Sequence, residues 1–214
     1  MLERIEIPDL RWPLEQHVEL IEEGNRRADL FTEKRKSTKR DTIHNFVVCD
    51  FGMVGATIDF IARNHLASGD TFCEWGSGMG VVTMMAQMAG FRASGIEVEG
   101  ELVQQSLGLA ADFGIDATFF EGSFLPDEID EARSNGLSED PYWESITDVD
   151  NVDLDAPSAY PDLGQSMDDF DLVFAFPWPG EHFFFEEIFD RYAAHGALLL
   201  TYDGRNGLNL QRRL

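Results

Sequence analysis

The chain has 214 residues, of which 43% are hydrophobic, and a net charge of −24 at pH 7. This length favours one α/β domain with a full hydrophobic core, because domains commonly contain about 100–200 residues. The negative charge disfavours broad binding to nucleic acids or anionic membranes, and no segment reaches the roughly 20 apolar residues of a membrane span. The first residues also lack the basic and apolar pattern of a secretory signal, so we expect a soluble, cytoplasmic, acidic protein.

Cys49 and Cys73 are the two cysteines, and they lie far apart in the sequence. Neither belongs to a CxxC pair, and the five histidines show no HxxxH or HExxH spacing. We therefore expect neither a disulfide framework nor a metal site.

Two helices are predicted before residue 67. Apolar residues recur at helical spacing over residues 12–36, and this stretch runs into the basic segment 34–40. A second apolar stripe extends from Val54 to His65, after an irregular or short extended segment at 41–50. Residues 1–66 are thus expected to form an N-terminal helical segment packed on the core.

Beyond residue 70, short apolar runs alternate with helical patterns, which indicates a parallel sheet with crossover helices. The predicted strands are Thr71–Trp75, Arg92–Glu97, Ala117–Glu121, Leu172–Phe176 and Ala197–Tyr202, and the predicted helices are Val81–Ala89, Glu99–Phe113 and Glu181–His195. Residues 67–214 are therefore expected to form a doubly wound, mostly parallel, Rossmann-like α/β sheet.

An insertion at residues 126–169 interrupts this alternation. Its residues 127–169 contain 14 acidic residues and a single basic one, Arg133. Such composition is typical of a solvated loop, although a connection this long can also be a functional lid. Tyr142, Trp143, Ile146 and Tyr160 are unusual in a purely solvated tract, so we expect part of the insertion to dock on the domain.

Three alternating glycines, Gly76, Gly78 and Gly80, follow the first strand of the predicted parallel sheet. They allow the backbone to turn sharply and to approach a ligand. A dinucleotide-binding loop would favour its third glycine at position 81, where Val81 stands, so a nicotinamide-dependent oxidoreductase is a distant alternative. Glu74, near the end of the strand, is placed to accept hydrogen bonds from the ammonium group of a methionine moiety.

Glu97 ends the second of these strands, 17 residues beyond Gly80. A carboxylate at this position can accept hydrogen bonds from both hydroxyls of a ribose. In a purely structural interpretation, the glycines only allow close packing of helix and strand, and Glu97 is a solvated strand end.

Residues 46–124 resemble class I S-adenosylmethionine-dependent methyltransferases. The stretch from Phe72 to Val82, FCEWGSGMGVV, is similar to their first motif, and that from Gly95 to Glu99, GIEVE, to their second. The segment from Glu121 to Phe124, EGSF, lies where the family usually has Gly-Asp, and Ser123 replaces the Asp that commonly approaches the adenine amino group. The resemblance implies that fold and S-adenosyl-L-methionine as the cofactor.

A weaker resemblance precedes the domain. The segment from Cys49 to Val54, CDFGMV, is similar to one in a subset that includes some protein-lysine methyltransferases, where a polar turn opens a helix beside the cofactor. Asp50 as a simple helix cap is the structural interpretation that we favour. The predicted cofactor-binding residues are Glu74, Gly76, Ser77, Gly78, Gly80, Glu97, Val98, Gly122, Ser123, Phe124, Phe176 and Pro177.

The fourth strand of the parallel sheet leads into Phe-Pro-Trp-Pro-Gly-Glu, residues 176–181, here called the exit segment. Amino-group methyltransferases that resemble this family often have a polar residue at the position of Phe176. Guanine-methylating tRNA enzymes typically have basic residues after such a Phe-Pro-x-Pro segment, whereas Gly180 and Glu181 follow it here. Trp178 and Glu181 are the candidate catalytic residues. In the alternative interpretation, Glu181 only provides a favourable negative charge at a helix N-terminus. His182 and His195 have no identifiable partner in the sequence.

The family's sheet usually ends in a helix and an antiparallel hairpin of its sixth and seventh strands, but only 12 residues follow Tyr202 here. We therefore expect the hairpin to be missing. The exposed edge of the last strand would then be covered by the N-terminal helices, by the insertion or by the second subunit of a homodimer.

The sequence favours an S-adenosylmethionine-dependent methyltransferase acting on a small molecule or a protein side chain, with nucleic acid and membrane disfavoured as partners. The alternative is a non-catalytic, methyltransferase-like module that binds the cofactor or a protein partner. The identity of the methyl acceptor, and of the atom that is methylated, does not follow from these motifs.

Overall fold

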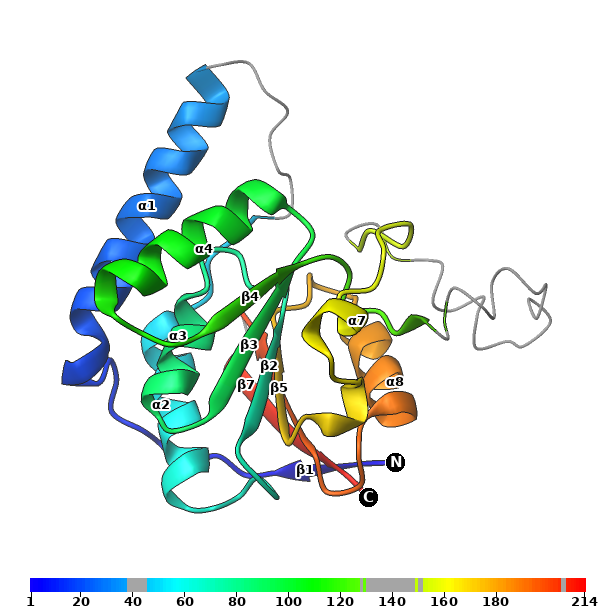
Figure 1. The fold of residues 1–214 in the computed structure, drawn as a ribbon. Coiled ribbons are helices and arrows are strands. Elements are labelled where there is room, and N and C mark those ends of the chain that lie inside the picture. Colours follow the sequence, from blue (N-terminus) through cyan, green and yellow to red (C-terminus); the bar gives the residue numbers. More distant parts are fainter. Residues whose placement is uncertain (38–45, 128, 130–148, 150–151, 205–206) are drawn as a thin grey trace.

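The computed structural model describes residues 1–37, 46–127, 129, 149, 152–204 and 207–214. These residues form one seven-stranded sheet with helices on both faces (Figure 1). The strands are β1 Leu2–Ile5, β2 Thr71–Trp75, β3 Arg92–Glu97, β4 Thr118–Glu121, β5 Leu172–Ala175, β6 Leu198–Asp203 and β7 Gly207–Arg213. Their order across the sheet is β1-β7-β6-β5-β2-β3-β4.

Five adjacent strands, β4, β3, β2, β5 and β6, are parallel to one another. Their carboxyl ends therefore lie along one edge of the sheet, which is where open α/β sheets bind ligands. The predicted bounds of β2 and β3 are confirmed, those of β4 and β5 differ by one residue at one end, and those of β6 differ by one residue at both ends.

The expectation of a missing hairpin is wrong. β7 pairs antiparallel with β6 from Leu198↔Arg212 to Asp203↔Gly207, and β1 pairs antiparallel with β7. The 12 residues are sufficient because β7 already begins at Gly207, which pairs with Asp203, the last residue of β6. The edge of β6, which we expected to be covered by the N-terminal helices, the insertion or a second subunit, is paired with β7, and the N-terminal residues supply the outermost strand.

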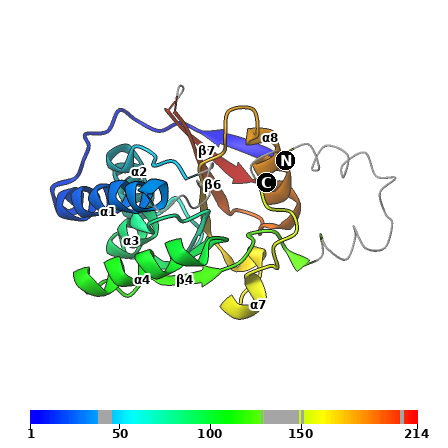
Figure 2. The ribbon, with the colours of Figure 1, turned by 90° about the horizontal axis from the view of Figure 1, so that it is seen from above.

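Among the described residues, four helices cover one face of the sheet, and two helices and a 3₁₀ turn lie against the other (Figures 1 and 2). The first group is α1 Val18–Ser37, α2 Phe51–Arg63, α3 Val81–Met88 and α4 Gly100–Phe113, and the second is α7 Tyr160–Leu163, the 3₁₀ turn η2 Met167–Asp169 and α8 His182–Tyr192. A further 3₁₀ turn, η1 Glu15–His17, precedes α1. No helix in the described part of the chain is both long and apolar enough to cross a membrane.

The helix Glu181–His195 was predicted too long. α8 ends at Tyr192 because the backbone of Ala193 is extended, with φ −72° and ψ 164°. Gly196, which follows the predicted helix directly, has φ 87° and lies between α8 and β6.

The described C-terminal part of the insertion docks on the domain, as Tyr160 suggested. Tyr160, Met167 and Phe170 are buried in the core on the α8 face. Tyr142, Trp143 and Ile146 lie outside the described residues. The insertion therefore combines a long acidic tract with a segment that is part of the hydrophobic core.

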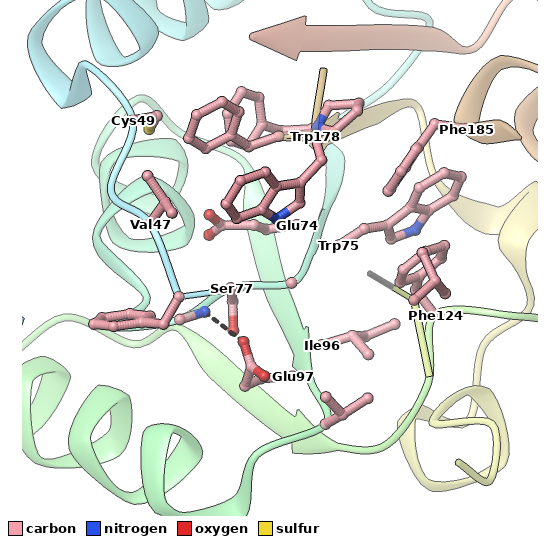
Figure 3. Close-up of a pocket in the computed structure, with 18 of the residues that line it drawn as sticks. Val47, Cys49, Glu74, Trp75, Ser77, Ile96, Glu97, Phe124, Trp178 and Phe185 are labelled. Carbon is pink, nitrogen blue, oxygen red and sulfur yellow. Dashed lines mark hydrogen bonds between the residues drawn. The ribbon is translucent and has the colours of Figure 1, made fainter. Parts of the chain in front are cut away.

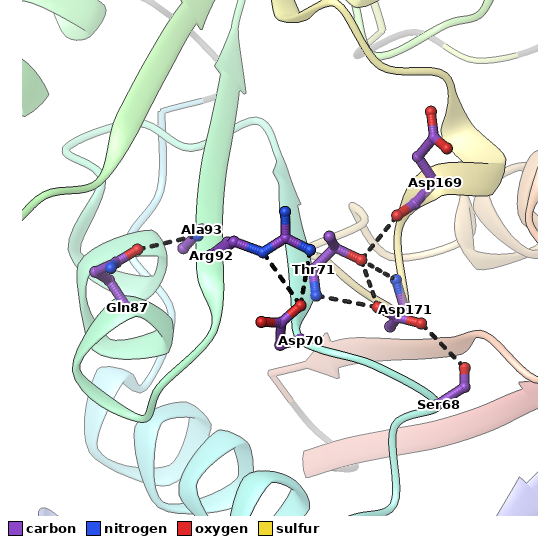
Figure 4. A network of polar contacts seen from close by, with 8 residues as sticks. All are labelled: Ser68, Asp70, Thr71, Gln87, Arg92, Ala93, Asp169 and Asp171. Atoms are coloured by element: carbon purple, nitrogen blue, oxygen red, sulfur yellow. Dashed lines mark hydrogen bonds and ion pairs between the residues drawn. The ribbon is translucent and has the colours of Figure 1, made fainter.

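Polar contacts fix the point where the insertion rejoins the sheet (Figure 4). The Thr71 hydroxyl donates to the Asp169 carbonyl at 2.7 Å, and the Thr71 backbone N–H donates to Asp171 Oδ2 at 3.0 Å. Ser68 Oγ donates to the other carboxylate oxygen of Asp171 at 3.1 Å. These bonds hold the start of β5 beside the start of β2 and so set the register of the strands that carry the site.

Candidate functional site

A cavity of about 500 Å³ opens at the carboxyl ends of the parallel strands. Figure 3 shows its wall, with Val47 and Cys49 on one side and Phe124 and Phe185 on the other. Of the predicted cofactor-binding residues, the cavity wall includes Glu74, Gly76, Ser77, Gly78, Glu97, Val98, Gly122, Ser123, Phe124, Phe176 and Pro177. Residues from seven separate segments of the sequence thus line one cavity.

Gly80 does not line the cavity. It is the N-cap of α3 and has φ 72°, and a Cβ atom there would lie 2.4 Å from the Phe119 ring. Its N–H donates to the Ser77 carbonyl at 2.7 Å. Gly80 therefore shapes the loop and allows close packing, as the structural interpretation held for this one glycine.

The loop at residues 76–80, here called the glycine loop, turns back over the end of β3. The N–H groups of Gly76 and Ser77 both donate to the Ile96 carbonyl at 2.9 Å. Gly76 has φ 74° and Gly78 has φ 54°, a left-handed conformation that strains any L side chain. The loop consequently presents bare backbone to the cavity.

Ser77 carries a buried hydroxyl without a partner among the described residues, which indicates a ligand-binding site. Its side chain lies in the cavity wall and is 5% exposed, and its Oγ has no hydrogen-bond partner within the described structure. Buried polar groups of proteins nearly always have a partner. A polar group of a bound molecule would supply the partner that the chain lacks.

Glu97 is 8% exposed, so its interpretation as a solvated strand end is wrong. Its Oε2 accepts from the Gly78 N–H at 2.8 Å, and its Oε1 accepts from the Glu99 N–H at 3.0 Å (Figure 3). Burial raises the pKa of Glu97, and the two backbone N–H groups oppose this shift. Because each oxygen accepts one bond inside the protein, each keeps a lone pair for a donor in the cavity.

Glu74 is 5% exposed at the end of β2. Its Oε2 accepts from the backbone N–H of Thr83 at 2.8 Å and from the Thr83 hydroxyl at 2.5 Å. Burial raises the pKa of Glu74 to about 8, although both bonds from Thr83 lower it. The side chain is therefore positioned by the first turn of α3, and a cation in the cavity would favour its ionised form.

The segment before α2, predicted only as irregular or short extended, forms a wall of the cavity. The ring of Phe46 covers Gly78, where a Cβ atom would lie 3.1 Å from it, and packs edge-on against Phe31 of α1 with ring centroids 5.9 Å apart. Asp50 accepts from the Met53 N–H at 3.0 Å and caps α2, so the helix-cap interpretation is confirmed. The sequence signal for this wall was the weak resemblance from Cys49 to Val54.

The exit segment, residues 176–181, forms the wall nearest α8. Both catalytic candidates, Trp178 and Glu181, line the cavity, and Trp178 points into it (Figure 3). Phe176 packs against Tyr202 with ring centroids 5.0 Å apart. An aromatic surface thus stands where the resemblance led us to look for a polar group.

His182 has a partner that sequence inspection missed. Its Nε2 lies 3.8 Å from Asp203 Oδ2, and both residues line the cavity. His182 begins α8 and Asp203 ends β6, so only the fold brings them together. His195, in contrast, is exposed between α8 and β6.

No protein-family model and no curated protein sequence matches the chain. A solved methyltransferase from Geobacter sulfurreducens is similar in structure, with 14% identity and a TM-score of 0.50 over 97% of this chain and 93% of that one. The chain has a class I methyltransferase-like fold.

Two further solved structures are similar. An RNA methyltransferase from Salinibacter ruber, in complex with S-adenosyl-L-homocysteine, has 16% identity and a TM-score of 0.45 over 73% of this chain and 88% of its own. A putative caffeoyl-CoA O-methyltransferase from Staphylococcus aureus has 13% identity and a TM-score of 0.44 over 87% and 72%. What the cavity of this methyltransferase-like chain binds must follow from its own residues.

Proposed function

We propose that the chain binds S-adenosyl-L-methionine in this cavity and transfers its methyl group to a small molecule or a protein side chain. The observation that carries this proposal is the pair of buried carboxylates, Glu74 and Glu97, on either side of the bare glycine loop. A buried carboxylate is costly without a partner, so both side chains favour a ligand that offers hydrogen-bond donors or positive charge.

The residues of the cavity fit the parts of this cofactor. Glu74 would accept hydrogen bonds from the ammonium group, and Glu97 would accept them from the ribose hydroxyls. The backbone at Gly76 and Gly78, with the Ser77 hydroxyl, leaves room and polar groups for the methionine portion. The neighbouring wall, which includes Val98, offers apolar surface to a flat base.

When bound, the cofactor supplies a methyl group on a positively charged sulfur. The chain would contribute mainly by positioning, since methyl transfer requires an acceptor in line with the methyl group. Trp178 would orient a planar acceptor. Glu181 and the His182–Asp203 pair also line the cavity, and they could take a proton from the acceptor.

Calorimetry with S-adenosylmethionine, S-adenosylhomocysteine and NAD tests the proposed cofactor. Glu97→Gln is expected to weaken S-adenosylhomocysteine binding at least about tenfold, because the amide presents a donor where an acceptor is needed. Glu121→Gln is the matched control: Glu121 is the register partner of Glu97 at the end of the next strand, but it is exposed and outside the cavity wall. Binding of NAD alone would overturn the proposal.

Incubation with methyl-labelled cofactor and fractionated cell extract tests the transfer. Label is expected in a small-molecule or protein fraction, and labelling by His182→Gln should fall while the affinity for S-adenosylhomocysteine stays within about twofold. Tight binding of S-adenosylhomocysteine with no labelled product in any fraction would instead favour a non-catalytic module.

A further inference from the structure

The end of β4 borders the cavity but offers it no acidic side chain. The Ser123 hydroxyl is 1% exposed and accepts from the Leu125 N–H at 3.2 Å. Glu121, the last residue of β4, is exposed and does not line the cavity. A base bound beside Ser123 therefore finds no carboxylate on this strand.

The insertion is bonded to that same strand end. The Ser123 N–H donates to the Pro157 carbonyl at 2.7 Å, and the Ala159 N–H donates to the Ser123 carbonyl at 2.9 Å. Gly122 makes this approach possible, since its Cβ would lie 2.9 Å from the Pro157 carbonyl oxygen and its φ is 150°. The described end of the insertion thus has a fixed position next to the cavity.

Asp153 is the carboxylate that this pairing brings to the cavity wall, beside Val152. Its Oδ1 accepts from the N–H groups of Asp155 and Ala156 at 3.0 and 3.1 Å, which fixes the orientation of the side chain. For Oδ2 no hydrogen bond or ion pair with another described residue is found. One oxygen thus holds the turn, and the other is available as an acceptor.

The neighbouring surface suits a flat, aromatic base. Phe124, Val98 and Val152 supply apolar surface, and Glu97, assigned above to a ribose, lies at the end of the adjacent strand. A purine attached to that ribose would extend toward residues 122–124 and 152–153. An amino group on its rim that reaches Asp153 would find a hydrogen-bond acceptor there, because a carboxylate oxygen accepts hydrogen bonds.

We propose that Asp153, carried by the insertion, accepts a hydrogen bond from the exocyclic amino group of the cofactor's adenine and selects a 6-amino over a 6-oxo purine. This inference rests on the proposed function. It gives the docked end of the insertion a role: it completes the base end of the cavity that β4 leaves without an acid.

The test compares S-adenosyl-L-homocysteine with S-inosyl-L-homocysteine, in which an oxygen replaces the amino group, by calorimetry on the full chain. The wild-type chain is expected to bind the amino form at least about tenfold more tightly, because a carboxylate repels the 6-oxo group. Equal affinities would overturn the inference and leave the proposed cofactor intact. If neither ligand binds, the proposed function fails and the inference fails with it.

Asp153→Asn sharpens the test. Asparagine keeps an oxygen for the N–H groups of Asp155 and Ala156, but it presents an amide donor in place of Oδ2. In Asp153→Asn the affinities for the two ligands are expected to lie within about twofold of each other. Asp155→Asn, outside the cavity wall, should retain the preference for the amino form. Circular dichroism establishes that both variants fold, and an unchanged preference in a folded Asp153→Asn variant would overturn the inference.

Discussion

Thr83 donates two hydrogen bonds to the same carboxylate oxygen of Glu74, one from its backbone and one from its hydroxyl, and both residues are buried. The raised pKa of Glu74, about 8, means that burial outweighs these bonds. A group that the fold keeps protonated near neutral pH links the stability of the empty protein to its affinity for a cation.

The free energy of unfolding should fall as the pH rises from about 5 to about 8.5. The folded-state pKa of Glu74 exceeds its unfolded value, so the native chain holds a proton that the unfolded chain releases in this window. The stabilisation is complete below the unfolded pKa and is lost through the folded pKa, by up to roughly 3–5 kcal/mol. Urea denaturation across this range, with Glu74→Gln as the reference, measures it; an equal pH slope in both proteins would contradict the shift.

Binding of S-adenosylmethionine at pH 7 should release a proton from Glu74. The ligand's ammonium group favours the carboxylate, whereas the empty site favours the acid. Calorimetry in two buffers of different ionisation enthalpy counts the released protons. Glu74→Gln is expected to bind more weakly and to release fewer protons, and an unchanged proton count would show that Glu74 does not meet the ammonium.

Gly76→Ala should abolish tight cofactor binding at a modest cost in stability. Gly76 has φ 74°, and a Cβ atom at this position would have no other protein atom within 4 Å, so the stability cost is backbone strain of about 1–2 kcal/mol. Gly114→Ala is the matched control, with φ 62°, equally open surroundings and a position outside the cavity wall. Both variants should lose similar stability in thermal melts, but only Gly76→Ala should lose affinity, and a parallel loss in both would contradict this role.

The antiparallel hairpin of β6 and β7 should be required for stability. Leu210 of β7 is fully buried, and Leu210→Ala is expected to cost about 2–5 kcal/mol. Leu214→Ala, at an exposed position beyond the strand, should change the free energy of unfolding by less than about 0.5 kcal/mol. Equal effects of the two substitutions in urea denaturation would count against a structural role of β7.

The sequence was most informative where local patterns carry the structure. The glycine loop was predicted because a buried strand, three glycines and an apolar helix are contiguous between Thr71 and Met88. Gly80 shows the limit of that pattern, since a glycine required for packing against Phe119 looks the same in the sequence as one that faces a ligand.

Long-range pairings explain what the sequence did not predict. β7 has only two apolar residues, Leu208 and Leu210, and its outer partner β1 lies some 200 residues away along the chain. The contacts of His182 with Asp203 and of Ser123 with Pro157 likewise join segments that are distant in the sequence, and no local sequence pattern predicts such contacts. The hairpin was also missed because we assumed that a helix would precede it. The 12 residues after Tyr202 are too few for both a helix and a hairpin.

The position of β1 has a consequence for biosynthesis. β1 precedes every other strand in the order of translation, yet it pairs with β7, which follows all of them. During synthesis β1 therefore stays without its hydrogen-bonding partner until the rest of the domain has left the ribosome. The pairing of β1 with β7 is therefore a late event in folding, because it joins the first and the last strand to be synthesised across a large sequence separation.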